Sequence, residues 1–117
     1  MKLLVIIIRH EKYVETRKEL ENAGFSSYSS LDVLGRGHLE GSAEVVKKTE
    51  QKETYGSDLY SRKMMEIYVI DKQVEKAVET VIRVNRNGLH GDGKIFVLPV
   101  KTARRVRTNE KGEIALL

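Results

Sequence analysis

The sequence predicts an α+β protein in which a strand–helix–strand unit occurs twice. Three observations carry this prediction: short apolar runs that end at charged residues or glycines, two segments with apolar residues at helical spacing, and the order of these segments along the chain. Two such units with right-handed crossovers give a ferredoxin-like βαββαβ sandwich, an antiparallel sheet with both helices on one face. The 117 residues, 40% of them hydrophobic, are expected to form a single domain, residues 1–117.

The first unit is expected near the start of the chain. The run Leu3–Ile8 is continuous, apolar and β-branched, which is typical of a buried strand. In Lys12–Ala23 apolar residues recur at helical spacing, and Gly24 stands where a left-handed residue would end a helix. Alternation of residue types in Phe25–Leu34 predicts a second strand with one polar face.

A long loop, residues 38–61, is expected between the two units, because this segment keeps no apolar period. A connection of this length inside a compact domain is commonly a functional arm. A strand over Met64–Ile70 follows, and Asp71 is the expected N-cap of a helix. The apolar stripe of that helix consists of Val74, Ala77, Val78, Val81 and Ile82. A last strand over Lys94–Leu98 is expected to stop at Pro99.

In this arrangement one face of the sheet has no helix to cover it. The strands are partly apolar and the chain is small, so the sequence predicts that copies associate through the bare face.

The composition excludes several kinds of chemistry. Without cysteine there is no disulfide, no zinc–thiolate or iron–sulfur site and no thiol nucleophile, and a reducing cytoplasm is the expected compartment. The apolar run at the start is too short to span a membrane, and Arg9 follows it directly, so neither membrane insertion nor export is expected. No Ser–His–acid or paired-carboxylate spacing indicates catalysis.

The net charge is concentrated near the end of the chain. Residues 101–111 hold five basic residues and one acidic residue, which accounts for the whole net charge of +4. A nucleic-acid surface would spread its charge more widely, so no nucleic-acid partner is expected. A compact anionic ligand fits this distribution better.

Two glycine-rich turns could approach the phosphates of such a ligand. They are Leu34–His38 and Gly88–Lys94, and either one taken alone is more often a tight turn beside a strand than a phosphate site. Arg105 and Arg107 stand at alternate positions of an extended segment, from which both can contact one polyphosphate. The three features together favour a nucleotide.

On these residues the sequence resembles the PII signal-transduction family of nitrogen regulatory proteins. Gly91–Val100 and Arg105–Thr108 match the signature regions of that family, and Gly35 and Gly37 match its pattern at the base of the long loop. The order of elements matches over the whole chain. The sequence looks most like the NifI-type branch, which regulates nitrogenase, and within it the second member of the tandem pair. That similarity is carried by Val84–Gly88, Leu98–Val100 and Arg105–Gly112.

The resemblance implies a trimer, or a hetero-oligomer with a second NifI-type subunit, that binds ATP or ADP in the clefts between neighbours. Mg²⁺ would enter with the ATP phosphates, with no side chain of the protein as a metal ligand. Ser29 and Glu66 are the implied neighbours of the adenosine. The implied phosphate-side contacts, with His38 from the first glycine-rich turn, are Gly35, Gly37, His38, Gly91, Asp92, Gly93, Lys94, Arg105 and Arg107.

The resemblance also implies 2-oxoglutarate as an effector that binds beside Mg-ATP at the base of the long loop. Here the sequence departs from the family, because His38-Leu39-Glu40 stands where a common PII protein has Arg-Gln-Lys. Leucine cannot replace the glutamine that helps to chelate magnesium and 2-oxoglutarate. We therefore expect a different set of contacts, around Leu39 and Gly41, with Arg62 as the carboxylate partner.

The function implied is that of a nitrogen-status sensor and not of an enzyme. Nucleotide and metabolite would select conformations of the long loop, whose Tyr55 and Tyr60 suit contact with a target protein. The NifI branch implies dinitrogenase as the target, inhibited when nitrogen is sufficient. Alternatives are a regulator of an ammonium transporter or biosynthetic enzyme, an RNA-binding module, and a small phosphate-handling enzyme on the same fold.

Overall fold

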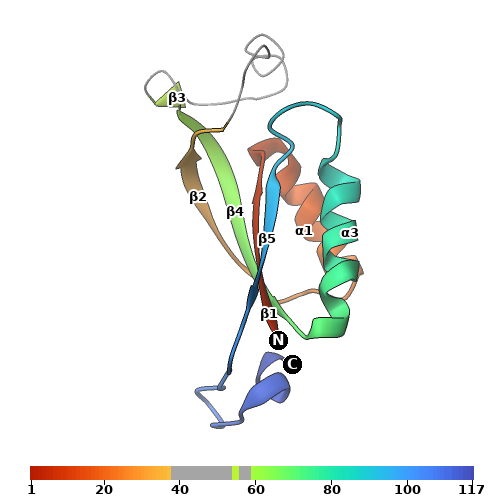
Figure 1. Ribbon diagram of the computed structural model, residues 1–117, viewed down its shortest axis with the longest axis vertical. Coiled ribbons are helices and arrows are strands. Elements are labelled where there is room, and N and C mark those ends of the chain that lie inside the picture. Colours follow the sequence, from red (N-terminus) through yellow and green to blue (C-terminus); the bar gives the residue numbers. More distant parts are fainter. Residues whose placement is uncertain (38–53, 56–58) are drawn as a thin grey trace.

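The computed structural model of the chain describes residues 1–37, 54–55 and 59–117. Its strands and helices follow the expected order, with short 3-10 helices at several ends (Figure 1). The strands are β1 (Lys2–Ile8), β2 (Ser29–Gly35), β3 (Thr54–Tyr55), β4 (Leu59–Val69) and β5 (Lys94–Pro99). The helices are α1 (Tyr13–Asn22) and α3 (Val74–Asn85), and the 3-10 helices are η1 (His10–Lys12), η2 (Asp71–Gln73) and η3 (Gly112–Leu116).

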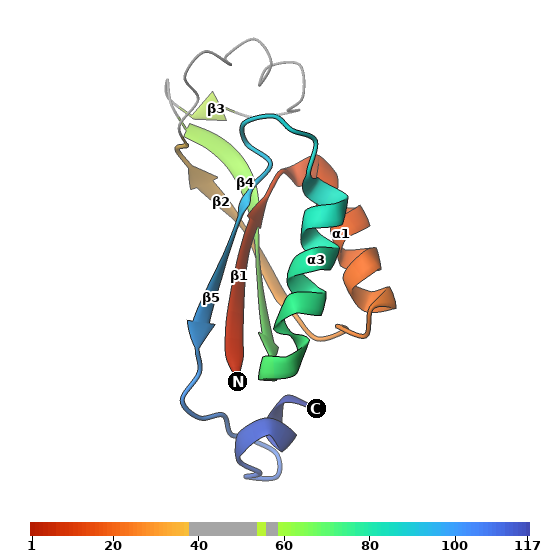
Figure 2. The ribbon, with the colours of Figure 1, turned by 45° about the vertical axis from the view of Figure 1, so that its right-hand side comes forward.

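Four of the strands form one antiparallel sheet in the order β2-β4-β1-β5. Ile6 of β1 stands opposite Met65 of β4 on one side and Ile95 of β5 on the other. The short β3 pairs with the start of β4 and lies off this path. Both helices lie on the same side of the sheet (Figure 2). The predicted ferredoxin-like α+β fold is therefore confirmed.

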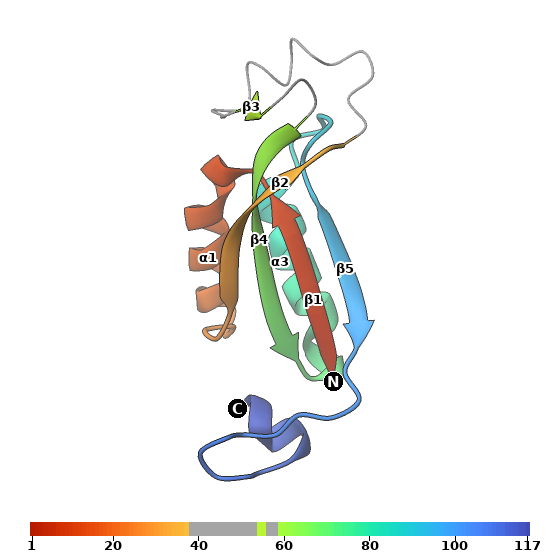
Figure 3. The same ribbon diagram turned by 90° about the vertical axis from the view of Figure 1, so that its left-hand side faces the viewer.

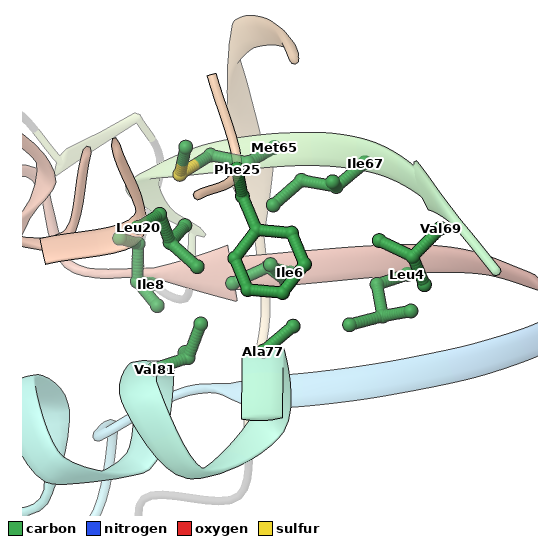
Figure 4. Packing of buried hydrophobic residues seen from close by; sticks show 10 residues of the cluster. All are labelled: Leu4, Ile6, Ile8, Leu20, Phe25, Met65, Ile67, Val69, Ala77 and Val81. Carbon is green, nitrogen blue, oxygen red and sulfur yellow. The ribbon is translucent and has the colours of Figure 1, made fainter. Parts of the chain in front are cut away.

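The core lies between the sheet and the two helices. Alternate residues of the two central strands, such as Ile6 and Met65, are fully buried there because the side chains of a strand point to opposite faces in turn. Leu20 of α1 and Val81 of α3 pack onto them (Figure 4). Each large apolar side chain buried in this way contributes about 1.5–3 kcal/mol.

The opposite face of the sheet carries no helix. Figure 3 shows the molecule from this side, with α3 behind the strands. Its outward side chains include four large apolar residues between 42% and 50% exposed: Leu31, Tyr68, Phe96 and Leu98. They come from three different strands, which cross-strand pairing brings together on this face. We call this the uncovered face. The sequence predicted that one face of the sheet would have no helix on it.

Two expectations at the ends of elements are wrong. β2 begins at Ser29 and not at Phe25, whose ring is buried in the core between α1 and the strand. Asp71 does not cap α3, which begins at Val74 after a turn of 3-10 helix. Instead the Asp71 carboxylate accepts hydrogen bonds from the Met1 amino group at 2.8 Å and from the Lys2 ammonium at 3.1 Å.

The expected long loop is shorter at its far end. β4 already begins at Leu59, so residues 59–61 are strand, and Thr54–Tyr55 form β3. The remainder of the expected loop, 38–53 and 56–58, lies outside the described residues. β4 extends this far because its first half pairs with β2, with Gly35 opposite Tyr60, and not because of apolar periodicity.

Candidate functional site

The loop between α3 and β5, residues 86–93, turns at three glycines with left-handed backbone. The φ angles of Gly88, Gly91 and Gly93 are 80°, 93° and 121°. Gly93 is also pressed against β1, since an added Cβ would lie 2.3 Å from the carbonyl oxygen of Ile7. Only glycine fits this position without a shift of the backbone. We call residues 86–93 the glycine loop.

Asp92 ties the glycine loop together from within. Its Oδ2 accepts hydrogen bonds from the backbone N–H of Asn87 at 3.0 Å and of Gly88 at 3.2 Å. Its Oδ1 accepts one from Nη1 of Arg9 at 2.8 Å. Nη2 of Arg9 donates to the carbonyl of His90 at 2.7 Å. Asp92 is therefore a residue that shapes the loop.

The pKa of Asp92 lies below its usual range. Partial burial is the largest single influence and raises it, but the hydrogen bond from Arg9 and those from the two backbone amides together outweigh burial and lower the pKa. The carboxylate is consequently ionised at neutral pH and balances the charge of Arg9.

The remaining groups of the glycine loop are suited to an anion. Within the described part of the chain, the backbone N–H groups of His90 and Gly91 meet no hydrogen-bond acceptor. Lys94, the first residue of β5, is exposed beside them. Free amides in a glycine-rich turn next to an ammonium group form a common phosphate-binding arrangement.

A cleft of about 350 Å³ opens between α3 and β5 under the glycine loop. Apolar residues such as Ile8, Val81 and Ile95 line most of it, and Arg86 and Lys94 stand at its polar end. The side-chain amide oxygen Oδ1 of Asn85 also lies in this region without a partner in the described residues. That atom is inaccessible to water, so a ligand in the cleft could not reach it.

The base of the first glycine-rich turn, residues 34–37, lies at the same end of the sheet as the glycine loop (Figure 1). Gly35 ends β2, and nothing lies within 4 Å of an added Cβ at Gly35 or Gly37. His38, Leu39 and Gly41 lie outside the described residues. The structure therefore places the base of this turn but none of the effector contacts expected beyond it.

Ser29 and Glu66, the implied neighbours of the adenosine, lie side by side in the sheet. They are directly opposed in the β2–β4 register. Their neighbours Ser30 and Met65 point toward the helices. Because successive side chains of a strand point to opposite faces, Ser29 and Glu66 point to the uncovered face.

The basic segment near the end of the chain lies beyond the opposite end of the sheet from the glycine loop (Figure 1). The Arg105 guanidinium contacts Glu110 and the carbonyls of Ile114 and Leu117, with 2.9 Å between Nη2 and the Ile114 oxygen. Arg107 is exposed at the turn that these contacts hold.

The structure does not bring the two halves of the expected nucleotide site together within one copy. β5 runs from Lys94 beside the glycine loop to Pro99 at the other end, and its length is roughly 20 Å at ~3.3 Å per residue. Arg105 and Arg107 lie further along the chain (Figure 2). A ligand that contacts both ends must therefore lie between two copies.

The residues expected to serve the effector and the partner lie near the start of β4. The Arg62 guanidinium stacks over the Tyr60 ring at 5.5 Å and donates to the Ser61 carbonyl at 3.1 Å. Tyr55 belongs to β3, which pairs with this part of β4.

Sequence reasoning missed Arg9 as a site residue. It is 2% exposed, although arginine is rarely buried without partners. The signal available was its position directly after a buried strand, where a charged side chain must either leave the sheet or find an acceptor.

The described residues contain no group of three or more His, Cys, Asp or Glu side chains that could hold a metal ion. Among the helices that the structure describes, none has the length and apolar content to cross a membrane.

The described residues form a ferredoxin-like domain with a glycine loop at one end of the sheet and one sheet face that no helix covers (Figure 3). Comparison with known proteins gives the family: the model of "Nitrogen regulatory protein P-II" matches residues 1–110. The chain belongs to the PII family, whose members are regulatory signal transducers and not enzymes. The resemblance found in the sequence is thus confirmed.

Individual relatives agree over their full length. The chain is 40% identical to "Nitrogen fixation nifHD region GlnB-like protein 2" of Methanothermobacter marburgensis over 121 residues, covering 99% of this chain and 100% of the relative. It is 39% identical to the protein of the same name from Methanobacterium ivanovii, covering 100% of both. It is also 38% identical to "Nitrogen regulatory protein P-II 2" of Methanothermobacter thermautotrophicus, covering 99% of this chain and 97% of the relative.

Gly93→Ala should destabilise the fold by about 1–3 kcal/mol, because its Cβ meets the Ile7 carbonyl and its φ is left-handed. Urea unfolding measures this loss. Gly35→Ala is the matched control, since its Cβ meets nothing, and should change the free energy of unfolding by no more than about 0.5 kcal/mol. Equal effects of the two substitutions would contradict the close contact.

Ionisation of Asp92 should make the free energy of unfolding depend on pH. Because its folded pKa is lowered, its contribution is fully present above the unfolded pKa of about 3.9 and is lost as pH falls through the folded pKa. The difference in unfolding free energy between the native protein and Asp92→Asn should therefore be constant above about pH 5 and shrink below about pH 4. Urea unfolding across this range measures it, and Glu79→Gln, an exposed carboxylate on α3, is the charge-matched comparison. A difference that does not change with pH would count against the role of Asp92.

Proposed function

We propose that this protein senses nitrogen status through bound ATP or ADP and regulates nitrogen fixation by docking on a target protein. The observation that carries the proposal is full-length similarity to proteins named for the nitrogen fixation nifHD region, together with a glycine loop whose free amides suit phosphate. The cytoplasm is the compartment in which such a sensor would act.

The nucleotide site is proposed to lie between copies. The uncovered face supplies apolar surface for association, which single copies cannot bury. A trimer places the end of one copy that bears Lys94 beside the end of its neighbour that bears Arg107. A hetero-oligomer with a second NifI-type subunit would make the same contacts.

Each copy would supply two sets of contacts. The glycine loop, Lys94, Gly35, Gly37 and His38 would face the phosphates of one nucleotide. Ser29, Glu66, Arg105 and Arg107 would face the nucleotide shared with the other neighbour. Magnesium would enter with ATP, coordinated by its phosphates. Arg107 is the more direct phosphate contact, because the Arg105 guanidinium already holds the end of its own chain.

The effector 2-oxoglutarate is proposed to bind next to Mg-ATP, between Leu39, Gly41 and Arg62. Arg62 lies on β4 three residues past Leu59, at the base of the segment that would respond to the ligand. A bidentate guanidinium can replace part of the charge compensation that the missing glutamine and its magnesium would supply.

The target is proposed to be dinitrogenase, contacted through Tyr55 and Tyr60. Ligands can change this contact only by binding one conformation of the segment more tightly than another. The alternative target is an ammonium transporter or a biosynthetic enzyme. It is supported by the relative whose name, "Nitrogen regulatory protein P-II 2", does not mention nitrogen fixation.

Mixing two defective variants tests the shared site. Lys94→Ala and Arg107→Ala should each weaken ATP binding by at least ~30-fold, as expected for loss of a charged contact to phosphate. After subunit exchange, a 1:1 mixture should regain full affinity at about a quarter of the sites, because some interfaces then pair an intact Lys94 with an intact Arg107. Calorimetry measures the affinity and the number of sites.

Its control mixes Lys94→Ala with a chain that carries both substitutions, in which no interface has an intact Lys94 and no affinity should return. If exchanged mixtures of the single variants regain nothing, the two residues do not share a site across copies. Unchanged affinity in both single variants would overturn the nucleotide site itself.

Titration of 2-oxoglutarate with and without Mg-ATP tests the effector. Binding should require Mg-ATP, and Arg62→Ala should weaken it by at least ~10-fold. Arg83→Ala, on the outer side of α3, is the control and should leave it unchanged. Binding without nucleotide, or full binding by Arg62→Ala, would show that the metabolite is recognised elsewhere.

A further inference from the structure

Arg9 is the most deeply buried charged side chain in the described part of the chain, at 2% exposure. It follows β1 directly, and its guanidinium reaches across to the glycine loop. Two of its nitrogens have separate acceptors there: Asp92 Oδ1 at 2.8 Å and the His90 carbonyl at 2.7 Å. The guanidinium is therefore held at two points of one loop.

The glycine loop has little of its own to fix its shape. Three of its residues are glycines with left-handed φ, and glycine carries the largest loss of backbone entropy on ordering. Two of its internal hydrogen bonds run from the amides of Asn87 and Gly88 to the Asp92 carboxylate, and a third runs from the amide of Leu89 to Oδ1 of Asn87. Arg9 connects this carboxylate to the sheet.

Burial of a guanidinium is costly unless its charge and N–H groups are matched. Asp92 and the His90 carbonyl supply the two short hydrogen bonds of this match, while the carboxylate of Glu11 lies 4.0 Å from Nε. A loop conformation that moves Asp92 and His90 away breaks both short hydrogen bonds of a buried guanidinium, so such conformations are disfavoured.

We propose that Arg9 is the positioning residue of the anion site: through Asp92 and His90 it holds the glycine loop in the conformation in which the amides of His90 and Gly91 meet no acceptor of the described residues and stay available to an anion. Arg9 itself does not touch the ligand. This inference rests on the proposed nucleotide site and adds a residue to which that site assigns no role.

The test compares Arg9→Met, Arg9→Lys and Arg83→Met as full-length proteins. Arg83→Met is the matched control, because it removes the same charge from an exposed ion pair with Glu19. Hydrogen exchange without ligand reports loop order, and calorimetry with ATP reports the site.

Arg9→Met should speed the exchange of the hydrogen-bonded amides of Asn87, Gly88 and Leu89 by at least ~10-fold while those of β1 and β4 stay protected, and should weaken ATP binding by at least ~10-fold. Arg9→Lys should fall between it and the native protein, since an ammonium is a point donor that cannot hold both acceptors in the geometry of a fork. A purely structural role would raise exchange throughout the sheet and follow global stability. Arg83→Met should match the native protein.

A second variant separates the loop contact from general destabilisation. Asp92→Asn combined with Arg9→Met should weaken ATP binding little more than either alone, because both break the same contact. Additive losses, unchanged loop exchange in Arg9→Met, or native ATP affinity in Arg9→Met would each overturn the positioning role. Failure of the native protein to bind ATP would instead overturn the proposed function and this inference with it.

Discussion

β1 is apolar on both of its faces, and one chain covers only one of them. The side chains that point to the helices are buried, and those that point away share the uncovered face with Tyr68, Phe96 and Leu98. A central strand of this kind buries its second face only against another surface. The proposed assembly, and the proposed sharing of a ligand between copies, both depend on the apolar surface of the uncovered face.

The same sheet sets the distance between the glycine loop and the basic turn. The glycine loop stands at one end of β5, and the basic turn around Arg107 follows the other. A nucleotide gripped at both ends would link neighbouring copies, so its binding and the strength of their association would be thermodynamically coupled. The nucleotide would thus report on the assembly as well as on its own concentration.

The elements set by apolar pattern could be predicted from the sequence. β1 and α3 are nearly where their periodicity puts them, and the chain turns at Gly88, Gly91 and Gly93 as their glycine content indicates. The start of β2 was wrong because alternation continues through Phe25, although that ring turns into the core. The early start of β4 escaped detection because pairing with β2, and not its own pattern, makes it a strand.

Long-range polar contacts could not be predicted from one sequence. Arg9 and Asp92 are 83 positions apart, and the residues around either one give no indication that the two side chains form a hydrogen bond. Asp71 looked like a helix cap because its type suits one, but the amino group of Met1 competes for the same carboxylate. The separation of Arg107 from the glycine loop likewise depends on the direction of β5 in the folded chain.

The contact at Gly93 limits how the glycine loop can move. Because its backbone lies against the Ile7 carbonyl, the start of β5 cannot shift without a break in its register with β1. Gly88 has no such restriction, since nothing lies within 4 Å of a Cβ added there and its φ is 80°. A change of loop shape that keeps the sheet intact would therefore turn the chain near Gly88 and leave Gly93 in place against β1.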